Sequence, residues 1–194
     1  MTQEKIVALM EEVKEKASIK EKPKKWNKYY GDMCVRIFGE FISKEIPDKY
    51  TLSSPNAYIE GFPTEFDLLI IDKDASPKKY TNAYCPKDVG VGIEIKARGI
   101  FGRRENLEKI IGNIKGNFDA VRNDHPRIDF VYLTYEEVNC TKRKGSIQYL
   151  DETIKILEPY KVFCLKESRT VEEIEGEWEK LVLYLNNSLQ KGDS

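Results

Sequence analysis

Three ionisable residues lie inside two segments that otherwise have the composition of buried β-strands. The first segment reads Glu-Phe-Asp-Leu-Leu-Ile-Ile over 65–71, and the second reads Val-Gly-Ile-Glu-Ile-Lys over 91–96. They contribute Asp67, Glu94 and Lys96. A charge removed from water needs a metal ion, an opposite charge or several hydrogen bonds to compensate it. The pattern therefore predicts two strands that carry a polar site.

The spacing of these residues predicts the geometry of the site. In a strand, Glu94 and Lys96 point to the same face about 7 Å apart, and the residues between and before them point to the other face. Asp67 follows the turn-forming segment 61–64, so pairing of the two strands would place it beside Glu94. Two carboxylates and one ammonium then converge, an arrangement that suits Mg²⁺.

A second interpretation of the same residues is an ordinary half-exposed strand. In that case Glu94 and Lys96 form a solvated ion pair and have no chemical role. Asp67 favours the site, because the segment 66–71 is apolar on both faces apart from this one residue.

The order Asp67 followed by Glu94-Ile95-Lys96 resembles the PD-(D/E)XK signature. This nuclease superfamily includes restriction endonucleases and archaeal Holliday-junction resolvases. The resemblance implies that Asp67, Glu94 and the backbone carbonyl of Ile95 bind Mg²⁺, for which Mn²⁺ substitutes, and that Lys96 assists the attacking water. Phe66, rather than proline, precedes Asp67, a departure that weakens the specificity of the motif.

The resemblance also implies a further metal ligand from the first core helix. Many members of the superfamily carry a glutamate there, and Glu40 lies at the edge of the apolar stripe in the helix expected over 26–46. Glu45, Glu60 and Glu65 are alternatives for the same role. Each of these glutamates is otherwise interpreted as a surface charge.

Charge constrains a role in nucleic-acid binding. The chain has 32 Lys and Arg against 33 Asp and Glu, a net charge of −1, whereas dedicated DNA binders often have a basic excess. The distribution of charge along the chain matters more than the net charge. Arg98, Arg103 and Arg104 follow the proposed site directly, and we expect them to bind DNA phosphates there. The alternative is a solvated surface.

Periodicity predicts an α/β fold in which helices and strands alternate. We expect a restriction-endonuclease-like core, that is, a central mixed β-sheet flanked by helices, in one domain over 1–194 with an N-terminal helical lead-in over about 1–22. The expected helices are 3–17, 26–46, 104–122, 151–157 and 171–189, and the expected strands lie within 50–60, 65–72, 89–97, 130–133 and 161–165.

The connection 73–88 is long for a compact domain and carries two prolines, two tyrosines and several lysines. Loops of this length are often functional, and this one is expected either to cover or grip substrate or to be a mobile surface insertion.

Two further features of the sequence bear on the location of the protein. No apolar run has the length of a membrane span, and the N-terminus lacks the apolar core of a signal peptide, so we expect a cytoplasmic protein without a membrane partner.

The four cysteines are irregularly spaced and His125 is the single histidine, a pattern that makes a zinc site or a disulfide framework improbable. The apolar C-terminal helix serves either a homodimer contact or the core.

These observations together predict an Mg²⁺-dependent deoxyribonuclease that hydrolyses phosphodiester bonds, a restriction-type endonuclease. One alternative is a DNA-repair or Holliday-junction-resolving nuclease with the same fold. The other is a non-catalytic scaffold that binds nucleic acid or a protein partner.

Overall fold

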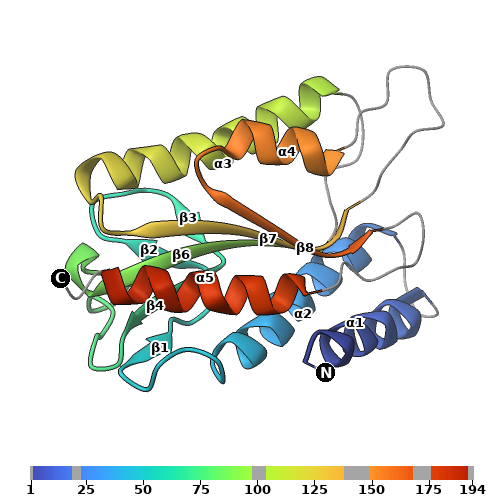
Figure 1. Cartoon of the computed structure of the whole chain (residues 1–194), viewed down its shortest axis with the longest axis horizontal. Helices are drawn as coiled ribbons and strands as arrows, with labels where there is room; N and C mark the ends of the chain where they lie inside the picture. Colours follow the sequence, from blue (N-terminus) through green and yellow to red (C-terminus); the bar gives the residue numbers. More distant parts are fainter. Residues whose placement is uncertain (1, 19–22, 98–103, 138–148, 168–175, 192–194) are drawn as a thin grey trace.

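The structure, a computed structural model, describes residues 2–18, 23–97, 104–137, 149–167 and 176–191 (Figure 1). Its elements, in chain order, are α1 (Thr2–Ser18), α2 (Pro23–Ile42), β1 (Tyr50–Leu52), β2 (Ala57–Ile59), β3 (Glu65–Phe66), β4 (Leu68–Asp72), β5 (Ala83–Tyr84), the 3₁₀ turn Pro86–Asp88, β6 (Val89–Lys96), α3 (Arg104–Asp124), β7 (Asp129–Glu137), α4 (Tyr149–Leu157), β8 (Lys161–Glu167) and α5 (Glu177–Lys191).

The main sheet has five strands in the order β1-β4-β6-β7-β8. The first three pair antiparallel, as expected for a meander, and β6, β7 and β8 are parallel. Parallel strands need a long crossover connection, and α3 and α4 supply the helices between β6 and β7 and between β7 and β8. The predicted mixed sheet flanked by helices is therefore confirmed.

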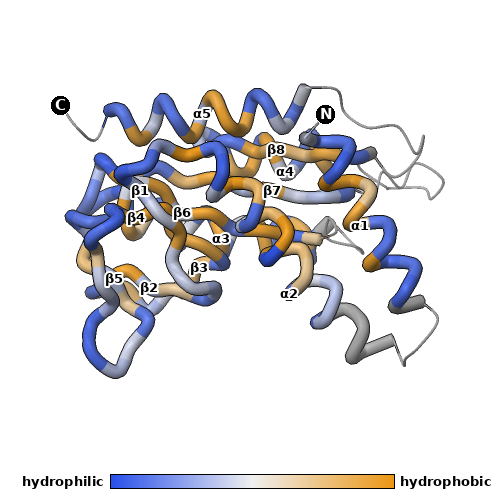
Figure 2. The backbone as a smooth tube through the Cα atoms, turned by 90° about the horizontal axis from the view of Figure 1, so that it is seen from below, coloured by the Kyte–Doolittle hydropathy of each residue, from blue (hydrophilic) through white to orange (hydrophobic). Residues whose placement is uncertain are grey.

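Helices cover both faces of this sheet. Figure 1 shows α3 and α4 on one face and α1, α2 and α5 on the other. In Figure 2, α5 alternates hydrophobic and hydrophilic segments, as expected of a helix that packs one face on a sheet. Ile93 and Ile95 lie in the core under α1, α2 and α5. Phe66 and Phe130 lie in the core under α3 and α4.

Close packing requires a glycine in β6 on the face that points towards α3 and α4. A Cβ on Gly92 would lie 2.6 Å from the Phe130 ring, which is too short for a real contact. The same ring stacks on Phe118 with a centroid distance of 4.8 Å. This aromatic packing anchors α3 and β7 beside the middle of β6, and Glu94 follows Gly92 on the same face.

A second sheet of three short strands, β3-β2-β5, lies to one side of the main sheet (Figure 2). Strands lie within both predicted regions, 50–60 and 65–72, but each region holds two short strands where one was predicted. The first region is divided by a turn that ends at Asn56, whose φ is 60°, and the second is divided at Asp67. The long connection 73–88 supplies β5, which pairs in parallel with β2.

Two helix boundaries also differ from expectation. α2 begins at Pro23, because proline is well tolerated in the first turn of a helix, and it ends at Ile42. The predicted end at Ile46 is too late: residues 43–46 continue as hydrogen-bonded turns, such as Glu45 N–H to the Ile42 carbonyl at 3.0 Å. The expected start of the last helix lies in residues 168–175, outside the described residues.

Candidate active site

Asp67 lies between β3 and β4, at the point where the chain passes from the small sheet into the main sheet. The pairing of Leu68 with Ile93 places Asp67 across from Glu94. The Asp67 Oδ2 atom accepts a hydrogen bond of 2.7 Å from the Ile95 backbone N–H. The carboxylate thus accepts a hydrogen bond of the kind that a backbone carbonyl of a neighbouring strand would accept. This bond holds the carboxylate against the end of β6.

Glu94 and Lys96 project from β6 on the face opposite Ile93 and Ile95. The Lys96 ammonium forms an ion pair with Glu94 Oε1 and lies 3.6 Å from Asp67 Oδ2. It also donates a hydrogen bond of 3.3 Å to the Ile95 carbonyl. The structure therefore brings together the three predicted side chains, and one cation contacts all three groups predicted to bind a metal.

These three side chains are largely shielded from solvent. Their exposed fractions are 21% for Asp67, 16% for Glu94 and 32% for Lys96. These fractions do not fit a solvated Glu94–Lys96 pair on a half-exposed strand. The alternative interpretation of the sequence also leaves the contact with Asp67 without an explanation.

The electrostatics of the site favour an additional cation. Burial raises the pKa of Glu94; Lys96 opposes this shift and Asp67 adds to it, so the pKa lies above its ordinary value. Burial lowers the pKa of Lys96, but attraction to Glu94 and Asp67 outweighs burial and the net shift is upward. Two carboxylates thus face one ammonium, and negative charge is in excess.

The set of oxygen donors is small. Among the residues that the structure describes, no three His, Cys, Asp or Glu side chains form a group that could hold a metal ion. A metal at this site would have two carboxylates and the Ile95 carbonyl, with water and substrate oxygens for the rest. Mg²⁺ prefers such a set, because it retains several waters and binds few protein carboxylates.

Of the remaining predicted site residues, the structure describes Glu40 and Arg104. The Glu40 side chain on α2 is 66% exposed and accepts a hydrogen bond of 2.8 Å from Lys44. This placement does not support a metal-binding role for Glu40. Arg98 and Arg103 fall outside the described residues, and Arg104 begins α3.

Two strand residues next to the site were not predicted from the sequence. Tyr132 on β7 pairs with Glu94, and Thr134 pairs with Lys96; both are fully buried. Paired residues of parallel strands point to the same face of the sheet. Tyr132 and Thr134 therefore lie beside Glu94 and Lys96, on the edge of β6 that faces away from β4. On α2, burial raises the pKa of the Cys34 thiol well above its ordinary value and Asp67 adds to the shift.

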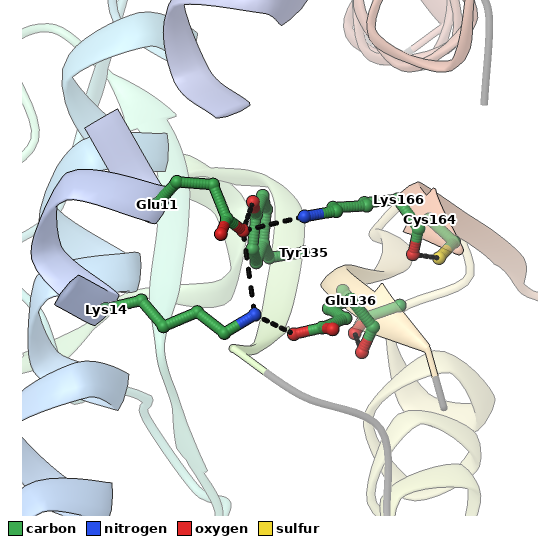
Figure 3. A network of polar contacts seen from close by, with 7 residues as sticks. Glu11, Lys14, Tyr135, Glu136, Cys164 and Lys166 are labelled. Carbon is green, nitrogen blue, oxygen red and sulfur yellow. Dashed lines mark hydrogen bonds and ion pairs between the residues drawn. The ribbon is translucent and has the colours of Figure 1, made fainter. Parts of the chain in front are cut away.

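A second group of charges joins α1 to the carboxyl ends of β7 and β8 (Figure 3). We call Glu11, Lys14, Tyr135, Glu136 and Lys166 the α1 charge cluster. Glu11 accepts hydrogen bonds from the Tyr135 hydroxyl at 2.5 Å and from Lys166 Nζ at 2.8 Å. Lys14 Nζ lies 3.2 Å from Glu136 Oε2.

The α1 charge cluster has a different electrostatic balance. Burial raises the pKa of Glu11, but hydrogen bonds from Lys166 and Tyr135 outweigh burial, so the pKa lies below its ordinary value. The sequence analysis missed this cluster because the expected strands 130–133 and 161–165 stop before its charged members. Both strands extend further, to Glu137 and Glu167, and charged residues directly after an apolar run were the signal.

Across the described ranges, no helix has both the length and the hydropathy that a membrane crossing requires. Cys34, Cys85 and Cys164 are free thiols. Cys140, the fourth cysteine, lies outside the described residues.

Comparison with known proteins identifies the fold. No protein-family model matches the sequence, and no curated protein matches it. Among solved structures, cAAA-bound NucC of P. aeruginosa ATCC27853 superposes with a TM-score of 0.57 at 12% identity, covering 96% of this chain and 91% of NucC. The cAAA-bound form of E. coli MS115-1 NucC superposes with a TM-score of 0.46 at 14% identity, covering 70% of this chain and 63% of that NucC chain. The chain therefore has the restriction-endonuclease-like α/β fold, as its motif predicted.

Proposed function

We propose that this protein is a metal-dependent DNA endonuclease of restriction type, which hydrolyses phosphodiester bonds. The main support is the contact of one ammonium, that of Lys96, with Asp67, Glu94 and the Ile95 carbonyl at the end of β6. The fold shared with NucC supports the general class of nuclease.

The donor set fits Mg²⁺, for which we expect Mn²⁺ to substitute. Asp67, Glu94 and the Ile95 carbonyl would hold the ion, because these oxygens already face a single cationic group and carry excess negative charge. When bound, such an ion stabilises negative charge on a phosphate and lowers the pKa of water.

Lys96 acts on the attacking water in this proposal. Its ammonium lies beside the same oxygens that would hold the ion, so that it orients or deprotonates the water and neutralises charge on the phosphate. Asp67 is held by the Ile95 N–H before substrate binds, so it needs no reorganisation during the reaction.

A cleavage assay on plasmid DNA tests the proposal. The purified chain is incubated with Mg²⁺, with Mn²⁺ or with EDTA, each with and without cAAA, the ligand of the NucC structure. We expect cleavage only with a metal, and none from Asp67→Asn or Glu94→Gln. Asp72→Asn is the matched control, because Asp72 is an exposed carboxylate at the far end of β4. Full activity in Glu94→Gln would refute the proposal.

The same assay separates the related functions. A preference for branched over linear duplex DNA would favour a repair or junction-resolving role over restriction. Metal and DNA binding without cleavage would favour a non-catalytic scaffold. A homodimer stays a prediction, and sedimentation analysis of the purified chain tests it.

A further inference from the structure

The connection 73–88 presents one tyrosine to solvent at its tip. Tyr80 is 91% exposed, and its φ of 66° is unusual for a residue with a side chain. The turn around it is well defined: the Lys78 N–H bonds to the Ala83 carbonyl at 2.8 Å, and the Thr81 N–H bonds to the Lys78 carbonyl at 2.9 Å. Tyr80, with its exposed ring and its unusual backbone conformation, therefore lies in a turn that backbone hydrogen bonds hold in place. Strain of this kind is frequent at ligand-contact sites.

Hydrogen bonds connect this tip to the candidate active site. Two residues after Tyr80, the Asn82 side chain donates to the Asn56 carbonyl at 3.0 Å. The Asn56 N–H in turn donates to the Asp67 carbonyl at 3.2 Å. Asn56 and Tyr80 are the two non-glycine residues with positive φ in the described part of the chain. Both positions with positive φ thus lie in the segments that connect the exposed ring to the backbone of Asp67.

The charges at the tip suit a negatively charged partner with flat rings. The Lys79 ammonium lies 4.9 Å from the centroid of the Tyr80 ring. Lys78 instead forms an ion pair with Glu60 at 2.5 Å, a contact that holds the tip against the small sheet. An exposed aromatic ring with an adjacent ammonium can stack on a base while the ammonium binds a phosphate.

We propose that Tyr80 contacts the DNA substrate and stacks on a base, while Lys79 binds a neighbouring phosphate. This inference rests on the proposed nuclease function and deepens it. A protein partner fits less well, because protein interfaces need a larger contact surface than one ring with a cation beside it.

Binding without cleavage tests this inference separately from catalysis. The full chain is titrated in EDTA against fluorescently labelled duplex and single-stranded DNA, and anisotropy is read. We expect Tyr80→Ala to weaken binding about 5- to 100-fold, the range for the loss of one stacked base, and Tyr80→Phe to stay within about twofold. Tyr29→Ala is the matched control, because Tyr29 on α2 is also exposed, at 52%. Equal melting temperatures show that the variants are folded.

Two further readouts distinguish stacking from a general loss of structure. A single strand with 2-aminopurine near its centre reports stacking as quenched fluorescence, and we expect Tyr80→Ala to remove the quenching. Lys79→Gln should weaken binding to all sequences and lower the slope of log K against log salt by about one.

The outcomes separate the two proposals. DNA binding that depends on Tyr80, in a chain that never cleaves, supports the inference and contradicts the proposed function. If the parent chain cleaves DNA and Tyr80→Ala binds DNA as tightly as the parent chain, the proposed function is supported and the inference is contradicted. No binding of either DNA probe by the parent chain, or an equal loss in Tyr80→Phe and Tyr80→Ala, overturns the inference.

Discussion

Two groups of charges lie at the same edge of the main sheet, where β6, β7 and β8 end. At the candidate active site, Asp67 and Glu94 face the single ammonium of Lys96. In the α1 charge cluster, two carboxylates face two ammonium groups and a phenol. The pKa of Glu94 is raised and that of Glu11 is lowered. The α1 charge cluster therefore compensates its charges within the chain, whereas the candidate active site has one more carboxylate than ammonium groups, and we expect a metal ion to compensate the difference.

The two groups also differ in what holds their members in place. Asp67 is oriented by a backbone N–H and Glu94 by its place in a central strand. Glu11, in contrast, reaches from α1 to two strands through side-chain contacts alone. Backbone-held groups are preorganised for chemistry, and side-chain bridges between elements join those elements.

The largest expected difference is in catalysis. Glu94→Gln should reduce the Mg²⁺-dependent cleavage rate by on the order of 10³-fold or more, because it removes a carboxylate from the proposed metal site. Glu11→Gln makes the same chemical change in the balanced cluster and should leave the rate within about threefold. Single-turnover cleavage kinetics measure both. Similar rate losses in the two variants would remove the distinction between the clusters.

Metal binding should separate the clusters in a stability measurement. At a Mg²⁺ concentration of about 100 times Kd, binding stabilises the native state by about 2.7 kcal/mol, which raises Tm by about 5–10 °C in a chain of this length. The Tm shift should be lost in Glu94→Gln and kept in Glu11→Gln. Thermal unfolding over a Mg²⁺ titration measures it, and an unchanged shift in Glu94→Gln would place the ion elsewhere.

Removal of one partner should reveal the structural role of the α1 charge cluster. Lys166 is buried, and Lys166→Met leaves Glu11 without its ammonium partner on β8. We expect the free energy of unfolding in urea to fall by about 1–3 kcal/mol. The control is Lys180→Met, which removes an exposed ion pair with Glu177 and should leave the unfolding curve unchanged. An equally stable Lys166→Met variant would show that the cluster contributes nothing net.

The smallest effect is expected from pH. Because the folded-state pKa of Glu11 is lowered, its contribution is present above the ordinary glutamate pKa of about 4.3 and is lost as the pH falls through the folded-state value. The Tm difference between the parent chain and Glu11→Gln should therefore shrink below about pH 4.3. The effect is small, because the Glu11 side chain is partly exposed and screened by water. A constant difference across this range would contradict it.

The sequence predicted the parts of the molecule that depend on local pattern. Apolar periodicity located α1, α3 and the central strand β6 within a few residues. The two-residue period of a strand placed Glu94 and Lys96 on one face, and the structure brings Asp67 to them. The break at Asp67 was missed, because it results from a carboxylate that accepts the Ile95 N–H across the sheet.

Residues that act across elements escaped prediction for the same reason. Glu11 and Lys166 are 155 positions apart in the sequence, and no local pattern relates them. Tyr80 lay in a segment expected either to cover or grip substrate or to be a mobile surface insertion. Its positive φ and its connection to Asp67 through Asn56 depend on a sheet that the sequence did not indicate.

The sequence by itself determined the alternation of helices and strands, the two apolar strands with their charged residues, and the order of Asp67, Glu94 and Lys96. These follow from side-chain period and composition, which are properties of neighbouring residues. The tertiary structure alone decided which charges are balanced and how far each is removed from water. Pairing and burial depend on distances between segments far apart in the chain, and those distances exist only after the sheet and its helices have packed.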